Sequence, residues 1–254
     1  MNKPIKYLTF GLKLKTGINF TGKKTFKTRG SGRSKRLFRF IDFYRENYLV
    51  TSYIIRIEYD PNRSANIALI CYKNGILSYI IANDGLKENT FLNNNYKGIG
   101  TICLLGDLKF GTFISCIELR SNFGAKLIRS AGCYGVVLHK NLIDNKVIVR
   151  LPSGEERYIQ SNSKVALGII SNIDHKLKKK VKAGNNIWLG KKPKVRGVAK
   201  NCVDHPHGGG RGKTSPLVLA SNFTRKVFKG VPSSSNMFIN NKLIVKSRKN
   251  ILKK

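Results

Sequence analysis

Positive charge is concentrated at the two ends of this chain, and the uneven distribution restricts which parts of it fold alone. Residues 1–49 carry a net charge of +11 and residues 171–254 a net charge of +19, whereas residues 50–170 carry only +5. A segment of nearly balanced charge buries a core readily, but a strongly basic segment repels itself until an anion neutralises it. We therefore predict a folded middle between two basic extensions that bind a polyanion.

The whole chain has 254 residues, a net charge of +35 and a hydrophobic content of 41%. This hydrophobic content is sufficient for real cores, which excludes a disordered polycation. The usual partner of such a charge is nucleic-acid phosphate, and an acidic membrane surface is the alternative. The sequence has no apolar run of about 18 residues and no secretory signal at its N-terminus, so we expect no membrane partner.

The cysteine pattern argues against a structural zinc site and against disulfides. None of the five cysteines has Cys-x-x-Cys spacing, so a zinc ribbon is not expected. An odd, scattered set is typical of a reducing compartment. The cysteines are Cys71, Cys103, Cys116, Cys133 and Cys202.

Short β-strands separated by turn residues fill the middle of the chain. Asn74-Gly75 lies between two apolar runs, which is the strongest short-range signal for a β-hairpin. Asp60-Pro61-Asn62 and Pro152-Ser153-Gly154 are further turns. The expected strands are 53–59, 66–72, 76–81, 100–105, 111–119, 133–139, 145–151, 155–160 and 164–170.

These strands predict a mainly β fold with two small barrels. The strands before the break at Ser121–Gly124 suggest a small closed barrel such as an OB-fold. The later strands suit an SH3-like barrel, although periodicity alone does not separate this from other small β folds. We expect a basic N-terminal extension (1–49), an OB-fold domain (50–120), an SH3-like barrel (121–180) and a basic C-terminal extension (181–254).

A glycine-rich loop near the C-terminus has unusual chemistry. Residues 201–213 read Asn-Cys-Val-Asp-His-Pro-His-Gly-Gly-Gly-Arg-Gly-Lys. Proline and consecutive glycines exclude a stable helix or a central strand, and they allow the backbone to approach another molecule closely. The loop is surrounded by cations, which indicates a polyanionic partner. They are Arg196, Lys200, Arg211 and Lys213.

This loop closely resembles the signature of the uL2 family of large-subunit ribosomal proteins. Four other segments resemble the same family in the same order: 40–43, 56–69, 127–132 and 193–199. Cys202 stands where the family usually has proline, and Arg211 where it often has glutamate. The family's elements beyond Lys213 are not recognisable here.

The resemblance implies an OB-fold followed by an SH3-like barrel, with both long, basic, irregular extensions in ribosomal RNA. It also implies that the glycine-rich loop approaches the peptidyl transferase region, where the residue matching His205 is linked to peptidyl transfer. By position alone, Arg63 is explained equally well as a surface arginine on a barrel turn and as an RNA contact. The family match favours the RNA contact. The residues that we expect to contact rRNA are Asn62, Arg63, Ser64, Arg129, Ser130, Arg196, Asp204, His205, His207, Gly208, Gly209, Gly210, Arg211 and Lys213.

Two other classes of function compete with this interpretation. A histidine- or metal-dependent RNA-modifying enzyme would need His205 and His207 beside further ligands or acids, and no motif supplies them. A standalone OB-fold protein that binds single strands would need aromatic platforms and no long tails. We therefore expect no catalytic residue, no protein-bound metal and no cofactor, with Mg²⁺ bound only through rRNA.

The expected partners are large-subunit rRNA, neighbouring ribosomal proteins and, at a bridge, small-subunit rRNA. The departures from the bacterial pattern and the enrichment in Asn, Ile and Lys favour an organellar ribosome. A mitochondrion is our first expectation, and a plastid or apicoplast is the alternative.

Overall fold

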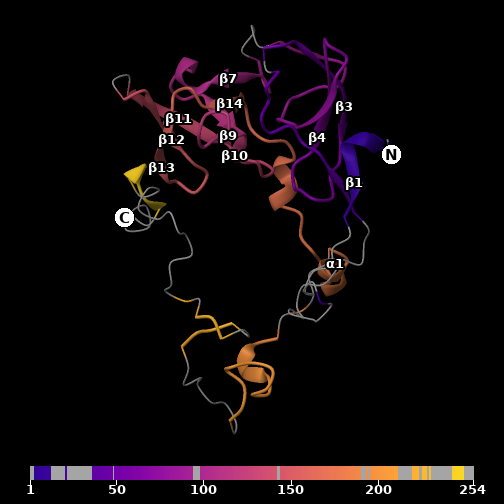
Figure 1. The fold of residues 1–254 in the computed structure, drawn as a ribbon, viewed down its shortest axis with the longest axis vertical. Coiled ribbons are helices and arrows are strands. Elements are labelled where there is room, and N and C mark those ends of the chain that lie inside the picture. The colour runs from indigo at the N-terminus through magenta and orange to yellow at the C-terminus, as the bar shows by residue number, and fades with distance from the viewer. Residues whose placement is uncertain are drawn as a thin grey trace. The chain divides into compact units, whose positions relative to one another are not determined.

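The chain forms two compact units in a computed structural model (Figure 1). The barrel unit comprises Met1–Leu12, Lys35–Lys179 and Asn240–Lys254, and the loop unit comprises Lys13–Ser34 and Lys180–Ile239. The structure describes residues 3–12, 21, 36–47, 49–93, 98–141, 144–189, 193, 195–210, 219–222, 225–227, 229 and 242–248.

The first sheet of the barrel unit is antiparallel, in the order β5-β4-β3-β6. Gly75 takes a φ of +78° between β4 and β5 and donates its N–H to the Tyr72 carbonyl over 2.8 Å, which confirms the predicted hairpin. Ile54, Ile70 and Ile80 are fully or almost fully buried in its core. The four strands are β3 (Ser52–Glu58), β4 (Ile67–Tyr72), β5 (Leu77–Ile81) and β6 (Phe91–Leu92).

The second sheet is also antiparallel and has the order β15-β13-β12-β11-β8-β14-β7 among the described residues. Figure 1 shows β11, β12 and β13 side by side. The strands are β7 (Ile102–Leu104), β8 (Phe113–Ser115), β11 (Gly135–Asn141), β12 (Lys146–Arg150), β13 (Glu156–Gln160), β14 (Lys164–Leu167) and β15 (Ile244–Lys246). Beside it, β9 (Ile117–Glu118) and β10 (Ala125–Leu127) form a two-stranded ribbon, and 3-10 turns occupy Leu105–Asp107 and Ile173–Lys176.

Two predicted strands belong to a different sheet from the one we expected. The segments 100–105 and 111–119 contain β7 and β8, which pair with β14 in the second sheet rather than with the first barrel. The reason is core composition, because Leu105, Leu108 and Ile114 fill the same core as Val137 and Val165. The break at Ser121–Gly124 is the turn between β9 and β10, and strand pairing does not change there.

A buried polar seam joins the two sheets of the barrel unit. The Asn83 side chain is 3% exposed and donates to the Ser115 hydroxyl over 2.7 Å and to the Leu167 carbonyl over 3.1 Å. The Ser171 hydroxyl accepts the Asn66 N–H over 3.1 Å. Because a buried polar group is costly without its partner, these bonds fix one sheet against the other.

The two extensions contain some regular structure. In the N-terminal part, β1 (Thr9–Gly11) pairs with β2 (Leu37–Arg39) after a 3-10 turn at Lys6–Leu8. In the C-terminal part, β15 pairs with β13 of the second sheet. The loop unit contains α1 (Ala183–Trp188) and a 3-10 turn at Gly197–Ala199. The mainly β prediction is confirmed, and the two sheets are consistent with an OB-fold followed by an SH3-like barrel.

Candidate RNA interface

The turn after β3 is organised by a buried carboxylate. Asp60 is fully buried, and it accepts the Asn62 N–H over 2.9 Å and the Arg63 Nε–H over 2.6 Å. Arg39 adds an ion pair of 3.7 Å from its Nη1 to the Asp60 Oδ1. Arg63 is therefore not a freely swinging surface arginine, because its guanidinium is fixed against the turn that the sequence predicts.

The same turn contacts the linker that contains Arg129 and Ser130. The Ser64 hydroxyl accepts the Ala131 N–H over 3.1 Å. The guanidinium carbons of Arg63 and Arg129 lie 6.0 Å and 4.9 Å from the centre of the Phe43 ring, within the range of cation–π attraction. The structure thus brings two separate motifs together, with Arg129 and Ser130 exposed.

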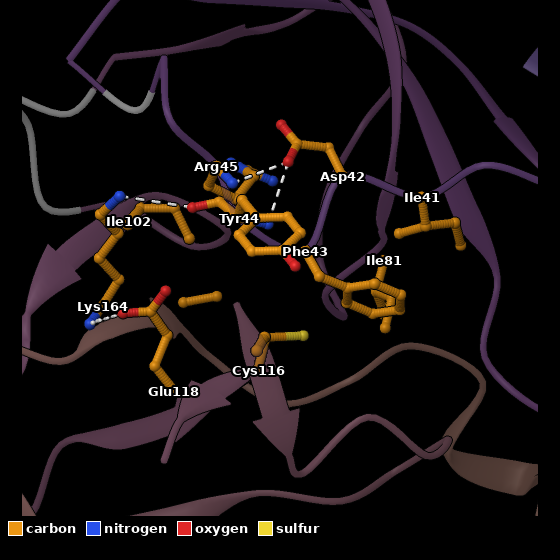
Figure 2. Close-up of a pocket in the computed structure, with 12 residues that line it drawn as sticks. Ile41, Asp42, Phe43, Tyr44, Arg45, Ile81, Ile102, Cys116, Glu118 and Lys164 are labelled. Carbon is orange, nitrogen blue, oxygen red and sulfur yellow. Dashed lines mark hydrogen bonds between the residues drawn. The ribbon is translucent and has the colours of Figure 1, made fainter. Parts of the chain in front are cut away.

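Phe43 is the residue of this patch whose role the sequence did not predict. Its segment, 40–43, resembles the family, but nothing in the sequence places its ring within reach of two arginines. The backbone of the turn is held by Asp42, which accepts the N–H groups of Tyr44 and Arg45 over 3.1 Å and 2.7 Å (Figure 2). The arginine patch, defined as Arg63, Arg129 and Phe43, is therefore rigidly supported.

A small cavity lies beneath this turn, and Figure 2 shows its lining. Its volume is about 20 Å³, roughly the space of one water molecule, so it does not hold a substrate or a nucleotide. Glu118 is buried at its edge and accepts the N–H groups of Asn122, Gly124 and Lys164 over 3.1–3.2 Å. Burial raises the pKa of the Cys116 thiol to about 11, so this cysteine is not a thiolate nucleophile at neutral pH.

In the loop unit, the two histidines of the predicted site are held by backbone groups. The Nδ1 of His205 accepts the His207 N–H over 3.0 Å, and the two rings contact edge to face with centroids 4.8 Å apart. The Nε2 of His207 accepts the Ser221 N–H over 3.2 Å. The N–H groups of Asp204 and His205 both donate to the Asn201 carbonyl, which closes the turn.

The hydrogen bond to Nδ1 determines the protonation state of His205. An imidazole nitrogen that accepts a hydrogen bond carries no proton, so the His205 proton sits on Nε2. The pKa of His205 is lowered from its ordinary value of 6.5 by burial first, and then by electrostatic repulsion from His207 and Lys200. His205 therefore presents a neutral N–H donor at neutral pH.

Two glycines leave the space that the loop needs. A Cβ on Gly197 would overlap the His205 ring, and a Cβ on Gly208 would overlap the carbonyls of Lys200 and Asn201. Of the other predicted residues, Gly209 and Gly210 have φ angles of +88° and +99°. Arg196, Asp204 and both of these glycines are exposed. Arg211 and Lys213 lie outside the described residues.

A serine–histidine pair also occurs here, as it does in some hydrolases. The Ser221 hydroxyl lies 3.3 Å from the His207 Nε2. The Ser221 backbone N–H occupies the same nitrogen, so Nε2 already accepts a hydrogen bond and is poorly placed to remove a hydroxyl proton. Among the described residues no three His, Cys, Asp or Glu side chains are grouped to hold a metal ion, and no helix there is long and apolar enough to cross a membrane.

Two family models cover most of the chain. Residues 5–93 match the RNA-binding N-terminal domain of ribosomal proteins L2, and residues 98–222 match the C-terminal domain of the same family. The chain belongs to the ribosomal protein L2 family. Members of this family are structural ribosomal proteins, and the sequence resemblance to uL2 is confirmed. The first match ends just after β6 of the first sheet, and the second match begins just before β7 of the second sheet.

Two relatives within the family are similar over most of their length. The uL2 protein of Azobacteroides pseudotrichonymphae is 45% identical over 215 residues, which cover 84% of this chain and 77% of the relative. The uL2m protein of Reclinomonas americana is 41% identical over 254 residues, which cover 98% of this chain and 90% of the relative. The chain is thus a structural protein of the large ribosomal subunit with an RNA-binding N-terminal domain.

Proposed function

We propose that this chain stabilises large-subunit rRNA around the peptidyl transferase region and acts there by positioning RNA rather than by catalysis. The observation that carries this proposal is the histidine loop, in which backbone bonds fix His205 as a neutral Nε2–H donor. A neutral donor suits a base edge or a ribose 2′-hydroxyl, which are the groups that RNA-binding proteins read outside regular duplexes. The His207 Nε2 already accepts the Ser221 backbone N–H, so it is poorly placed to act as a general base, which supports positioning.

The arginine patch has a different role in this proposal. Arg129 and Ser130 are exposed, and Arg63 is fixed beside them together with Asn62 and Ser64. Rigid guanidinium groups bind phosphate oxygens well, because less side-chain entropy is lost on binding. These residues dock the barrel unit onto the RNA backbone, and such contacts set orientation rather than sequence preference.

We place the protein in an organellar ribosome, with a mitochondrion favoured over a plastid or apicoplast. The match to the uL2m protein of Reclinomonas americana supports this placement. The match to the Azobacteroides protein is of similar strength, so the experiment compares the two kinds of organelle directly. Neighbouring ribosomal proteins and small-subunit rRNA at a bridge complete the proposed partners.

The experiment is sedimentation of the tagged full chain from purified mitochondria and from purified plastids, with sequencing of the RNA that copurifies. We expect the tag in the large-subunit fraction of one organelle, together with its large-subunit rRNA. A tag that stays at the top of the gradient in both preparations, or that copurifies only with other RNAs, contradicts the proposal.

A further inference from the structure

The β1–β2 ribbon of the barrel unit has two faces of opposite character. Its register pairs Thr9 with Arg39 and Phe10 with Phe38, and the Phe40 N–H continues the ladder by donating to the Leu8 carbonyl over 2.9 Å. Because side chains alternate along a strand, Phe10, Phe38 and Phe40 lie on one face while Arg39 points to the other. We call these three residues the phenylalanine face.

The opposite face of the ribbon is firmly attached to the first sheet. Arg39 is 8% exposed and forms an ion pair with the buried Asp60. Ile41, the next residue after Phe40, packs against the buried cluster that contains Tyr79, and the Tyr79 hydroxyl accepts the Ile5 N–H over 3.2 Å. The ribbon is therefore held in place, and the phenylalanine face is held outward by the packing of the other face.

The phenylalanine rings form a continuous aromatic surface. The centroid distances are 5.2 Å between Phe10 and Phe38, 5.4 Å between Phe10 and Phe40, and 5.9 Å between Phe38 and Phe40. Phe10 is 45% exposed and Phe40 is 51% exposed. On a ribbon with one buried face, the outward positions are normally polar, so three outward phenylalanines indicate an interaction surface.

The charge of the N-terminal sequence that contains this ribbon indicates the kind of partner. No acidic residue occurs before Asp42 in the sequence, whereas the same stretch carries 12 Lys and Arg residues. An apolar protein surface would bind such a face, but it would not neutralise this charge. A single-stranded nucleic acid satisfies both features, because its bases stack on aromatic rings while its phosphates bind cations.

We propose that the phenylalanine face is a stacking platform for unpaired nucleotides of rRNA, with one base over Phe10 and one over Phe40. The rings contact one another directly, so bases lie on their exposed faces and do not insert between them. This inference rests on the proposed rRNA binding of the chain and adds a defined subsite to it. The subsite is distinct from the histidine loop, which belongs to the loop unit.

The test compares two RNA probes of equal charge with the full-length chain. One probe is an oligouridylate of about 12 nucleotides, and the other is an abasic oligoribonucleotide of the same length. Binding of the uridylate probe is measured at about 0.5 M salt, where the electrostatic contribution of the tails is weak but stacking persists. Binding of the abasic probe is measured at low salt, because this probe binds only through its phosphates. We expect the double variant Phe10→Ala/Phe40→Ala to bind the uridylate probe about tenfold or more weakly than wild type, and to bind the abasic probe equally well.

Two further variants separate stacking from folding. Phe10→Tyr/Phe40→Tyr keeps flat rings and is expected to bind the uridylate probe within about twofold of wild type. Phe91→Ala removes a phenylalanine of the first sheet that is 75% exposed and lies outside the face, so it serves as the matched control with unchanged binding. Circular dichroism verifies that each variant is folded.

Several results would overturn the platform. If the double alanine variant loses the same affinity for both probes, or loses none for the uridylate probe, base stacking on the phenylalanine face is excluded. Self-association of the wild-type chain that disappears in the alanine variant, with uridylate binding unchanged, would assign the face to a second copy. Normal binding of the abasic probe at low salt in every variant shows that rRNA-backbone binding itself is intact, so failure of the platform is distinguishable from failure of the proposed function.

Discussion

At the scale of single residues, His205 is controlled by the backbone of its neighbour. The His207 N–H occupies the His205 Nδ1 at 3.0 Å, and Gly197 leaves room for the ring. The side chain is thus preorganised as a donor before any RNA is bound, which reduces the entropy lost on binding. A donor of fixed orientation is suited to positioning a nucleotide, and this distinction leads to an experiment.

Replacing His205 with Gln is expected to preserve more function than replacing it with Ala. Gln retains an N–H donor near the position of Nε2, whereas Ala loses it, and one hydrogen bond is worth about 1 kcal/mol, or roughly fivefold. Peptide transfer by purified subunits carrying each variant is the measurement, with subunit assembly assessed by sedimentation. Equal failure of Gln and Ala would indicate proton transfer instead, because an amide does not titrate near neutral pH. Full activity of the assembled Ala variant would leave the side chain without a functional role.

The lowered pKa of His205 gives the loop a pH dependence of known sign. Because the folded pKa lies below the ordinary 6.5, the disordered loop binds more protons between those two values, and the order of the loop falls as pH drops below about 6.5. Nitrogen-15 NMR of the imidazoles is expected to show the Nε2–H tautomer at pH 7.5 and a midpoint below 6.5. Lys200→Gln removes the positive charge of the Lys200 side chain and raises that midpoint, while the backbone carbonyl at position 200 still accepts the Gly209 N–H. A wild-type midpoint at or above 6.5 contradicts the assigned environment.

Asp60 is a second residue with a large expected effect. It is fully buried and bonded to Arg63 and Arg39, so Asp60→Ala leaves two partly buried guanidinium groups without their carboxylate. Breaking a buried ion pair in this way costs about 3 kcal/mol or more of unfolding free energy. The matched control is Asp144→Ala, which breaks the exposed pair with Lys146 and costs less than about 0.5 kcal/mol. Urea denaturation measures the free energy of unfolding of both variants. A similar loss of unfolding free energy in the two would disprove the structural role of Asp60.

At the scale of elements, local pattern predicts strands well but not their partners. The Asn74-Gly75 hairpin is confirmed because its turn chemistry acts within a few residues. The partners of β7 and β8 depend on which core receives Leu105 and Ile114, and that is a property of distant residues such as Val137. The same limit explains why β15 was not predicted within a segment that reads as an irregular basic extension.

Strand β15 is expected to protect the edge of the second sheet. Leu243 accepts the Tyr158 N–H over 2.8 Å, and Ile244 lies opposite Arg157 of β13. Deleting residues 242–254 exposes this edge, so the Tyr158 amide is expected to exchange with solvent at least tenfold faster, while the β12 amides stay protected. Deleting only residues 249–254 is the control and leaves Tyr158 protected. Unchanged protection of Tyr158 in the longer deletion would show that the β13–β15 pairing does not persist in solution.

At the scale of the whole molecule, the distribution of charge was the most useful sequence feature, because it depends on composition and not on packing. It indicated nucleic acid as the partner class, and the family match to ribosomal proteins L2 confirmed that class. The candidate site was predictable only in part. The sequence proposed Arg63, Arg129 and the histidines as RNA contacts, and that stays a prediction, whereas Phe43 and Ser221 contact them only after folding.

The basic run that leads into the loop unit is expected to contribute phosphate contacts that the barrel surface does not. Each phosphate that a lysine neutralises releases a counterion, so the slope of log affinity against log salt changes by about 0.7–0.9 for each contact. The tail variant changes four exposed lysines to Gln: Lys178, Lys179, Lys180 and Lys182. The control changes four exposed lysines to Gln that lie in the barrel unit before the basic run: Lys73, Lys87, Lys109 and Lys126.

Both variants lose the same net charge, so general attraction to RNA falls equally and only specific phosphate contacts differ. We expect the slope for large-subunit rRNA to become shallower by about 3 in the tail variant and by less than about 1 in the control. Filter binding of the full-length chains between about 0.1 and 0.5 M salt measures the slopes. Equal changes in the two variants would mean that charge acts over the whole surface, and a larger change in the control would place the phosphate contacts on the barrels.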